Sequence, residues 1–139
     1  ALNCERNIHG VFIKSRDYER NMEPNRKLIQ EYQRFYLLFP QSPYLEDVKV
    51  YRKRAMADLA EHELHVANYY FDKEAYHSAI GRYLYLLKYY PGFHRTGHVA
   101  ERLIEAYQLN QQPELAQEMQ KVLESLRKRK LLAQLTTRE

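Results

Sequence analysis

Cysteine and tryptophan are the rarest residues of this 139-residue chain, which has one cysteine, Cys4, and no tryptophan. One thiol cannot form a disulfide within the chain or build a thiolate metal cluster. Long apolar runs are missing too, because the longest two, 35–39 and 83–87, have five residues each. A helix needs about 20 apolar residues to cross a bilayer. We therefore expect no membrane-spanning segment.

Glycine and proline are sparse, with four glycines and five prolines. Every proline lies at a boundary between helical patterns, either in a first helical turn or directly after a helix. Between the prolines, apolar residues recur at steps of three and four, and no alternating strand pattern is present. The spacing predicts an all-α fold with helices over 24–39, 43–73, 75–90, 95–110 and 113–130. Residues 1–139 then form a single helical-repeat domain, in which 1–9 end a truncated helix and 10–23 form a loop.

One pattern recurs along the chain at a constant interval. Three pairs of residues share a spacing of 37: Tyr70 with Tyr107, Ala79 with Ala116, and Leu86 with Leu123. This interval is close to the length of a tetratricopeptide helix pair. The recurrence predicts a tetratricopeptide-like α-solenoid of antiparallel helix pairs, in which stacking of neighbouring pairs buries the core.

The histidines do not form a metal-binding pattern. His62 and His65 are three residues apart, whereas the His-Glu-x-x-His zinc motif needs four. His94 and His98 have the four-residue spacing, but no third ligand accompanies them. The chain also has no glycine-rich phosphate loop and no Gly-x-Ser-x-Gly nucleophile turn. We therefore expect no enzymatic activity, no cofactor and no metal.

The chain is mildly basic, with a formal charge of +4 and an isoelectric point near 9.1. This excess is too small to predict nucleic-acid binding. Acidic pairs such as Glu61 with Glu63 fit a solvated helix face. The basic run 127–130 lies near the predicted end of the last helix, where cations interact favourably with the helix dipole. An anionic lipid surface or an acidic partner is the alternative for this run.

Thirteen tyrosines are explained mainly by core packing, with the hydroxyl groups reaching the edges of helices. The helix over 75–90 also has a face away from its core stripe, which consists of Ser78, Arg82, Tyr85 and Tyr89. Arginine and tyrosine are enriched at binding hot spots, and Gly81 beside them leaves room for a partner. Two interpretations remain open for this face: protein binding, or packing against the next helix of the solenoid.

Several segments together resemble one known family. They are Leu59-Ala60-Glu61-His62-Glu63, Val66-Ala67-Asn68-Tyr69-Tyr70, Ala75-Tyr76-His77-Ser78-Ala79 with Arg82, and Tyr90-Pro91. Upstream, the family pattern is matched by Phe39-Pro40-Gln41-Ser42-Pro43-Tyr44 with Asp47, except that Phe39 and Val48 replace its usual tyrosine and alanine. Over about residues 24–126 the chain is similar to the BamD (YfiO/ComL) family, the tetratricopeptide lipoproteins of the outer-membrane β-barrel assembly machinery. The loop over 10–23 departs from the family by five extra residues.

The resemblance implies a helical solenoid that an N-terminal lipid tethers to the periplasmic face of the bacterial outer membrane. The chain opens at Ala1 without a methionine, so we expect a fragment that holds the C-terminal repeats. The lipid anchor, which is the one membrane contact that the resemblance implies, is then expected upstream of this fragment. In the family this part docks on a periplasmic POTRA domain of the barrel-forming subunit, and Arg82 matches an arginine of that contact. Accessory lipoproteins and unfolded outer-membrane proteins are the further partners that the resemblance implies.

The resemblance therefore predicts a non-enzymatic scaffold that binds a POTRA domain and supports the insertion of outer-membrane proteins. The alternative function is a generic tetratricopeptide adaptor, which binds a partner peptide in its concave groove. The tail over 128–139 has no counterpart in the family. We expect it either to bind an accessory lipoprotein or to extend the last helix.

Overall fold

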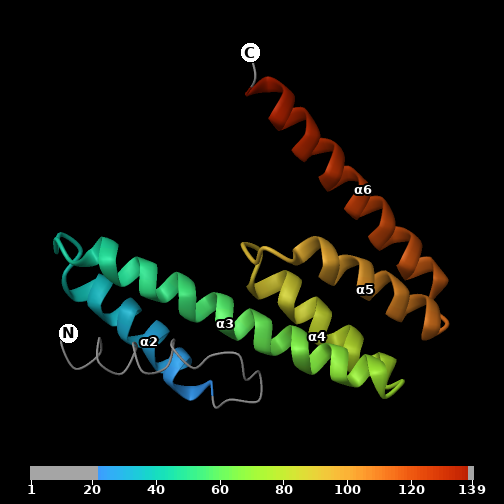
Figure 1. Ribbon diagram of the computed structural model, residues 1–139, viewed down its shortest axis with the longest axis horizontal. Helices are drawn as coiled ribbons and strands as arrows, with labels where there is room; N and C mark the ends of the chain where they lie inside the picture. Colours follow the sequence, from blue (N-terminus) through green and yellow to red (C-terminus); the bar gives the residue numbers. More distant parts are fainter. Residues whose placement is uncertain (1–21, 138–139) are drawn as a thin grey trace. The chain divides into compact units, whose positions relative to one another are not determined.

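The computed structural model describes residues 22–137, and this range forms five α-helices and no strand (Figure 1). The helices are α2 (Glu23–Leu38), α3 (Leu45–Asp72), α4 (Tyr76–Tyr89), α5 (Thr96–Leu109) and α6 (Pro113–Thr136). The predicted all-α fold is confirmed. The truncated helix expected over 1–9, nearly all of the loop expected over 10–23, and Cys4 lie outside the described residues.

The contacts within the chain divide it into two compact units. The first unit extends to His62 and the second begins at Glu63, so α3 contributes residues to both. The candidate site described below is built only from residues of the second unit. Within 22–137 no helix is long and apolar enough to span a membrane.

In the first unit, polar contacts connect α2 with α3. Asn25 near the start of α2 is buried, and its amide donates a hydrogen bond to Asp58 Oδ2 at 3.5 Å. Burial raises the pKa of Asp58, while the hydrogen bond from Asn25 acts in the opposite direction. The guanidinium of Arg52 lies 5.2 Å from the centre of the Tyr32 ring, a cation–π contact. Side chains of α3 thus hold both the first turn and the middle of α2.

In the second unit, α4 packs on α5 and α5 packs on α6 (Figure 1). The buried side chains come from the helical stripes predicted by the three-and-four spacing, and small alanines among them let the helix axes approach closely. The largest side chains that are fully buried are Leu64, Tyr83, Leu86, Val99 and Leu103. Consecutive helices therefore share one apolar core, as stacked helix pairs require.

Two turns of the second unit have the same geometry. Each contains a non-glycine residue with positive φ, Glu74 (60°) after α3 and Gln111 (58°) after α5. The following amide bonds back to the helix: Ala75 N–H to Tyr70 O at 2.9 Å, and Gln112 N–H to Tyr107 O at 2.8 Å. These are Schellman motifs, which satisfy the last carbonyl groups of a helix. Because the two turns are 37 residues apart, the structure confirms the repeat and the tetratricopeptide-like fold.

The last helix differs most from its prediction. It was expected over 113–130 but continues to Thr136, because 131–136 contain leucine and alanine and neither glycine nor proline. The alternative in which the tail extends the last helix is confirmed as far as Thr136. The basic run 127–130 therefore lies inside α6, and the last turn of α6 holds no basic residue. The interpretation of this run as a partner of the helix dipole is wrong. The other predicted helix ends differ from the observed ones by at most two residues.

Candidate protein-binding site

An ion pair between α3 and α4 forms the base of the candidate site. Glu63 on α3 is buried, with 8% of the residue exposed. Arg82 on α4 donates from Nη1 to Glu63 Oε2 at 3.0 Å, and 43% of its own side chain remains exposed. The carboxylate is thus held inside the unit while the guanidinium extends to the surface. This arrangement restrains the arginine without covering it.

An open pocket of about 570 Å³ lies beside this ion pair. It is lined by Glu63, Tyr70, Ser78, Gly81, Arg82 and Tyr85. A Cβ atom added to Gly81 would meet no other atom within 4 Å, so the backbone of α4 is accessible at this point. Every lining residue belongs to the second unit. The pocket combines one cation with two aromatic rings and an exposed stretch of helix backbone.

Tyr85 and Tyr89 extend the site along α4. Both are exposed, and their ring centres are 4.7 Å apart with the planes tilted by 45°. The ammonium group of Lys88 lies 5.2 Å from the centre of the Tyr89 ring. Tyrosine provides apolar contact area and a hydroxyl at low cost in conformational entropy. The face can therefore bind a partner surface by non-covalent contacts.

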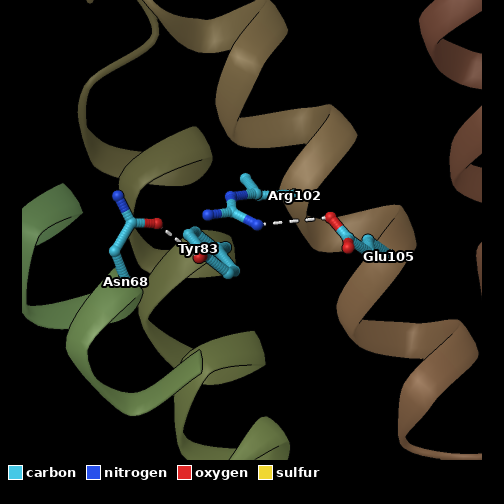
Figure 2. A network of polar contacts seen from close by, with 4 residues as sticks. All are labelled: Asn68, Tyr83, Arg102 and Glu105. Carbon is cyan, nitrogen blue, oxygen red and sulfur yellow. Dashed lines mark hydrogen bonds and ion pairs between the residues drawn. The ribbon is translucent and has the colours of Figure 1, made fainter. Parts of the chain in front are cut away.

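A buried polar contact holds α4 on its core side. Figure 2 shows Tyr83 between Asn68 of α3 and Arg102 of α5. The Tyr83 hydroxyl donates to Asn68 Oδ1 at 2.6 Å, and its ring is fully buried. Burial raises the pKa of Tyr83 to about 12, with the charge of Arg102 opposing the shift. Arg102 in turn forms an ion pair with Glu105 at 3.3 Å. Tyr83 thus holds α4 in an orientation in which the outer face of the helix is directed away from the core.

The structure brings the predicted site residues together on one helix face. Ser78, Arg82 and Tyr85 line the pocket, and Tyr89 contacts Tyr85. Ser78, Tyr85 and Tyr89 are exposed, so no described helix packs over them. Arg82 contacts a neighbouring helix through its ion pair with Glu63 of α3. Their role in protein binding stays a prediction.

Two pocket residues were missed by the sequence analysis. Glu63 was expected on a solvated face, but it is buried. Its neighbours four residues away, Leu59 and Ala67, are both buried, and this spacing is the signal that places Glu63 on the core side of α3. Tyr70 is one of the tyrosines for which core packing is the general expectation, whereas it is only partly buried and lines the pocket.

Core packing explains fewer tyrosines than the sequence suggested. Among those described, only Tyr83 and Tyr107 are buried. Five are exposed: Tyr36, Tyr44, Tyr69, Tyr85 and Tyr89. In a stacked helix pair only the row that faces a neighbouring helix is buried, and tyrosines beside that row stay on the surface. Tyr85 and Tyr89 belong to this second group.

The histidines stay outside this arrangement. His94 lies just before α5 and His98 lies in its first turn, and both are exposed. Within residues 22–137 no three His, Cys, Asp or Glu side chains come together as a metal site would require. The pocket holds no cysteine or histidine, and its serine has no base within it other than the carboxylate already paired with Arg82.

Comparisons with known proteins agree on one family. The chain matches the model of the YfiO family, described as outer membrane lipoprotein, over residues 3–123. It is 34% identical over 102 residues to outer membrane protein assembly factor BamD of Vibrio cholerae, covering 73% of this chain and 42% of that protein. The BamD proteins of Haemophilus influenzae and Pasteurella multocida are 29% and 30% identical, over 72% and 63% of this chain and over 38% and 34% of their own lengths.

The alignments cover most of this chain but less than half of each relative. The chain spans about two fifths of the length of the curated relatives named above. The matched range contains the whole of α2 to α5 and the part of α6 that packs on α5. Because the family model covers most of the sequence, the chain belongs to the YfiO family of outer membrane lipoproteins.

Proposed function

We propose that this protein is a non-enzymatic scaffold of the machinery that assembles β-barrel proteins in the outer membrane. It acts at the periplasmic face of that membrane, binds a POTRA domain of the barrel-forming subunit through the α4 face, and supports the insertion of outer-membrane proteins. The observation that carries the proposal is Arg82, which is half-exposed at an open pocket and anchored by the buried Glu63.

Family membership supports the assembly role. The relatives from three organisms are named outer membrane protein assembly factors, and each aligns with this chain over only part of its own length. The resemblance of the segments around α4 implies the POTRA contact and gives Arg82 a place in it. The exposed face of α4 supports the same position on physical grounds, because it presents an arginine and two tyrosines together.

The geometry of Arg82 explains how this contact would work. A guanidinium has five N–H donors in a rigid fork, and Glu63 is bonded through Nη1. The remaining donors are available to an acceptor on a partner. Since Glu63 already restrains the side chain, binding costs less conformational entropy than it would for a free arginine. Tyr85 and Tyr89 then add apolar contact area beside the charged group.

The first test is calorimetric titration of this chain with the tandem POTRA domains of the cognate barrel subunit. We expect binding by the wild type and a loss of about thirty-fold or more in Arg82→Gln, because truncating one member of a charged pair at an interface costs about 2–5 kcal/mol. Tyr85→Ser should also weaken binding. This second variant leaves the ion pair of Arg82 with Glu63 intact.

Controls separate binding from folding. Arg82→Gln leaves Glu63 buried without its cation, so the double variant Glu63→Gln/Arg82→Gln is compared by circular dichroism and should fold without binding. Arg54→Gln makes the same substitution at an exposed position of α3 and should bind like the wild type. No binding by the wild type would overturn the proposal. Unchanged binding by both site variants would remove the α4 face from it and favour a groove-binding adaptor.

A further inference from the structure

The C-terminal part of α6 is a surface that the proposed function does not use. The helix is anchored on α5 by the buried residues Ala116 and Leu123. Beyond them every residue from 124 to 137 is exposed. The ribbon of this segment, dark red in Figure 1, stands clear of α4 and α5 within the same unit. About four turns of helix thus carry no core packing.

Three leucines of this segment gather on one side of the helix. Leu131, Leu132 and Leu135 are 58%, 64% and 54% exposed. Because an α-helix advances about 100° per residue, side chains at these three positions share one arc of about 100°. That arc lies roughly a third of a turn away from Leu123, the contact with α5. The leucines therefore lie on a different side of α6 from its contact with α5.

Cations border the same arc. The run 127–130 consists of Arg127, Lys128, Arg129 and Lys130, all exposed. By the same angular step, Arg127 lies at one edge of the leucine arc and Arg129 at the other, while Lys128 precedes the leucines by one turn on their own side. Arg127 also pairs with Glu101 of α5, a bridge whose two side chains are both exposed. Such a surface pair contributes little stability and can exchange partners.

We propose that this end of α6 binds the surface of an anionic phospholipid bilayer. A helix with leucines on one face and lysines and arginines along its edges lies in the membrane interface, with the apolar face about 5–10 Å deep and the cations at the headgroups. Long lysine and arginine stems allow their charges to reach that level even from an apolar arc. Family membership puts such a membrane within reach of the chain.

Charge geometry favours lipid over a folded acidic partner. Four consecutive cations point to nearly all sides of the helix, and a rigid protein surface could pair with only one or two of them. Mobile anionic headgroups can gather around Arg127, Lys128 and Arg129 as the helix settles into the interface, with Lys130 on the solvent side. The segment also has no aromatic residue, the type that dominates protein–protein hot spots. This contact adds to the lipid anchor that the family resemblance implies, and it does not depend on the POTRA proposal.

The test is co-sedimentation of the full chain with vesicles. We compare pure phosphatidylcholine with an equal mixture of phosphatidylcholine and phosphatidylglycerol, and expect binding only to the mixture. Each cation near an anionic surface adds roughly five-fold to partitioning, so Lys128→Gln/Arg129→Gln should reduce binding about 25-fold. Leu131→Gln/Leu132→Gln/Leu135→Gln should abolish it. Glutamine keeps the helix propensity of these positions, which carry no core contact.

Matched controls come from the same chain. Lys53→Gln/Arg54→Gln removes two exposed cations of α3, and Leu115→Gln/Val122→Gln/Leu126→Gln removes three exposed apolar side chains from another face of α6. Both variants should retain vesicle binding. Equal binding to neutral vesicles, or wild-type binding by the three-leucine variant, would overturn the proposal. A lipid-free dimer that sedimentation shows to be lost in that variant would assign the surface to a second copy instead.

Discussion

At the scale of single residues, the contacts that hold α4 differ in their exposure to solvent. Tyr83 places its whole ring in the core and satisfies its hydroxyl on Asn68. Arg82, one position earlier on the helix, extends from a buried carboxylate to solvent. Neighbouring residues thus divide two tasks: Tyr83 fixes the helix, and Arg82 presents a charge. The candidate site is rigid on one side and open on the other.

Replacing Tyr83 by phenylalanine tests the buried hydroxyl. At neutral pH, Tyr83→Phe should lower the free energy of unfolding by about 1 kcal/mol, because the hydrogen bond is lost and Asn68 Oδ1 loses a partner. Tyr85→Phe makes the same change at an exposed ring and should have almost no effect. Urea denaturation followed by circular dichroism measures both. Equal effects of the two substitutions would contradict the buried hydrogen bond.

The same residue predicts a dependence of stability on pH. The pKa of Tyr83 is raised from 10.0 to about 12 in the folded state, so its contribution is fully present below pH 10. Between pH 10 and about pH 12 the unfolded chain releases this proton while the folded chain retains it, and stability falls. Urea denaturation on both sides of pH 10 should therefore show a shallower decline for Tyr83→Phe than for the wild type. Part of the decline remains, since burial also raises the pKa of Tyr107.

At the scale of elements, the repeat is most exact in its turns. Glu74 and Gln111 both adopt the left-handed conformation that closes a Schellman motif. An L-residue pays about 1–2 kcal/mol to adopt this conformation, and glycine does not. The left-handed conformation at Glu74 and Gln111 is imposed by the hydrogen bonds of the helix end rather than by the residue type. Each turn therefore keeps a small strain that a substitution can remove.

Glycine at these two positions should stabilise the chain. We expect Glu74→Gly and Gln111→Gly each to raise the free energy of unfolding by about 0.5–1 kcal/mol, after allowing for the greater flexibility of glycine when unfolded. Asn110→Gly is the control without a positive φ, because φ is −85° at Asn110, and it also removes the hydrogen bond from the Asn110 amide to Gln112 Oε1, so it should lower stability rather than raise it. Thermal and urea denaturation measure the three variants. A loss of stability in Glu74→Gly would contradict the strained turn.

At the scale of the molecule, the two proposed surfaces lie on different helices of the second unit. The α4 face combines Arg82 with tyrosines, and the end of α6 combines lysines and arginines with leucines. Aromatic side chains suit a folded partner, whereas leucines bordered by cations suit a lipid interface. Because the two surfaces share no residue, each can be removed without changing the other.

Reciprocal variants should show this independence. Arg82→Gln should lose binding to the POTRA domains and retain binding to phosphatidylglycerol vesicles. Lys128→Gln/Arg129→Gln should lose the vesicles and retain the POTRA domains. Both measurements use the same full chain, with calorimetry for the first partner and co-sedimentation for the second. Loss of both activities in either variant would mean that the substitution unfolds the second unit or that one surface binds both partners.

Much of the fold could be predicted from the sequence, because its signals are local. Helical spacing and proline positions depend on residues a few places apart, and these set the helices to within two residues of their observed ends, except at the end of α6. The 37-residue interval predicted the stacked pairs. The side of α4 that carries Ser78, Arg82, Tyr85 and Tyr89 also followed from spacing alone.

Only the tertiary structure decided what covers each face. Glu63 is buried and paired because α4 brings Arg82 against α3. Tyr70 lines a pocket because it lies beside the row of α3 side chains that packs against neighbouring helices, and not within that row. The leucines at the end of α6 are exposed because α5 ends its contact with α6 before reaching them. Burial depends on residues that are distant in sequence and near in space. Local pattern therefore determined the helices and their apolar sides, and packing between helices decided which polar groups came together at the candidate site.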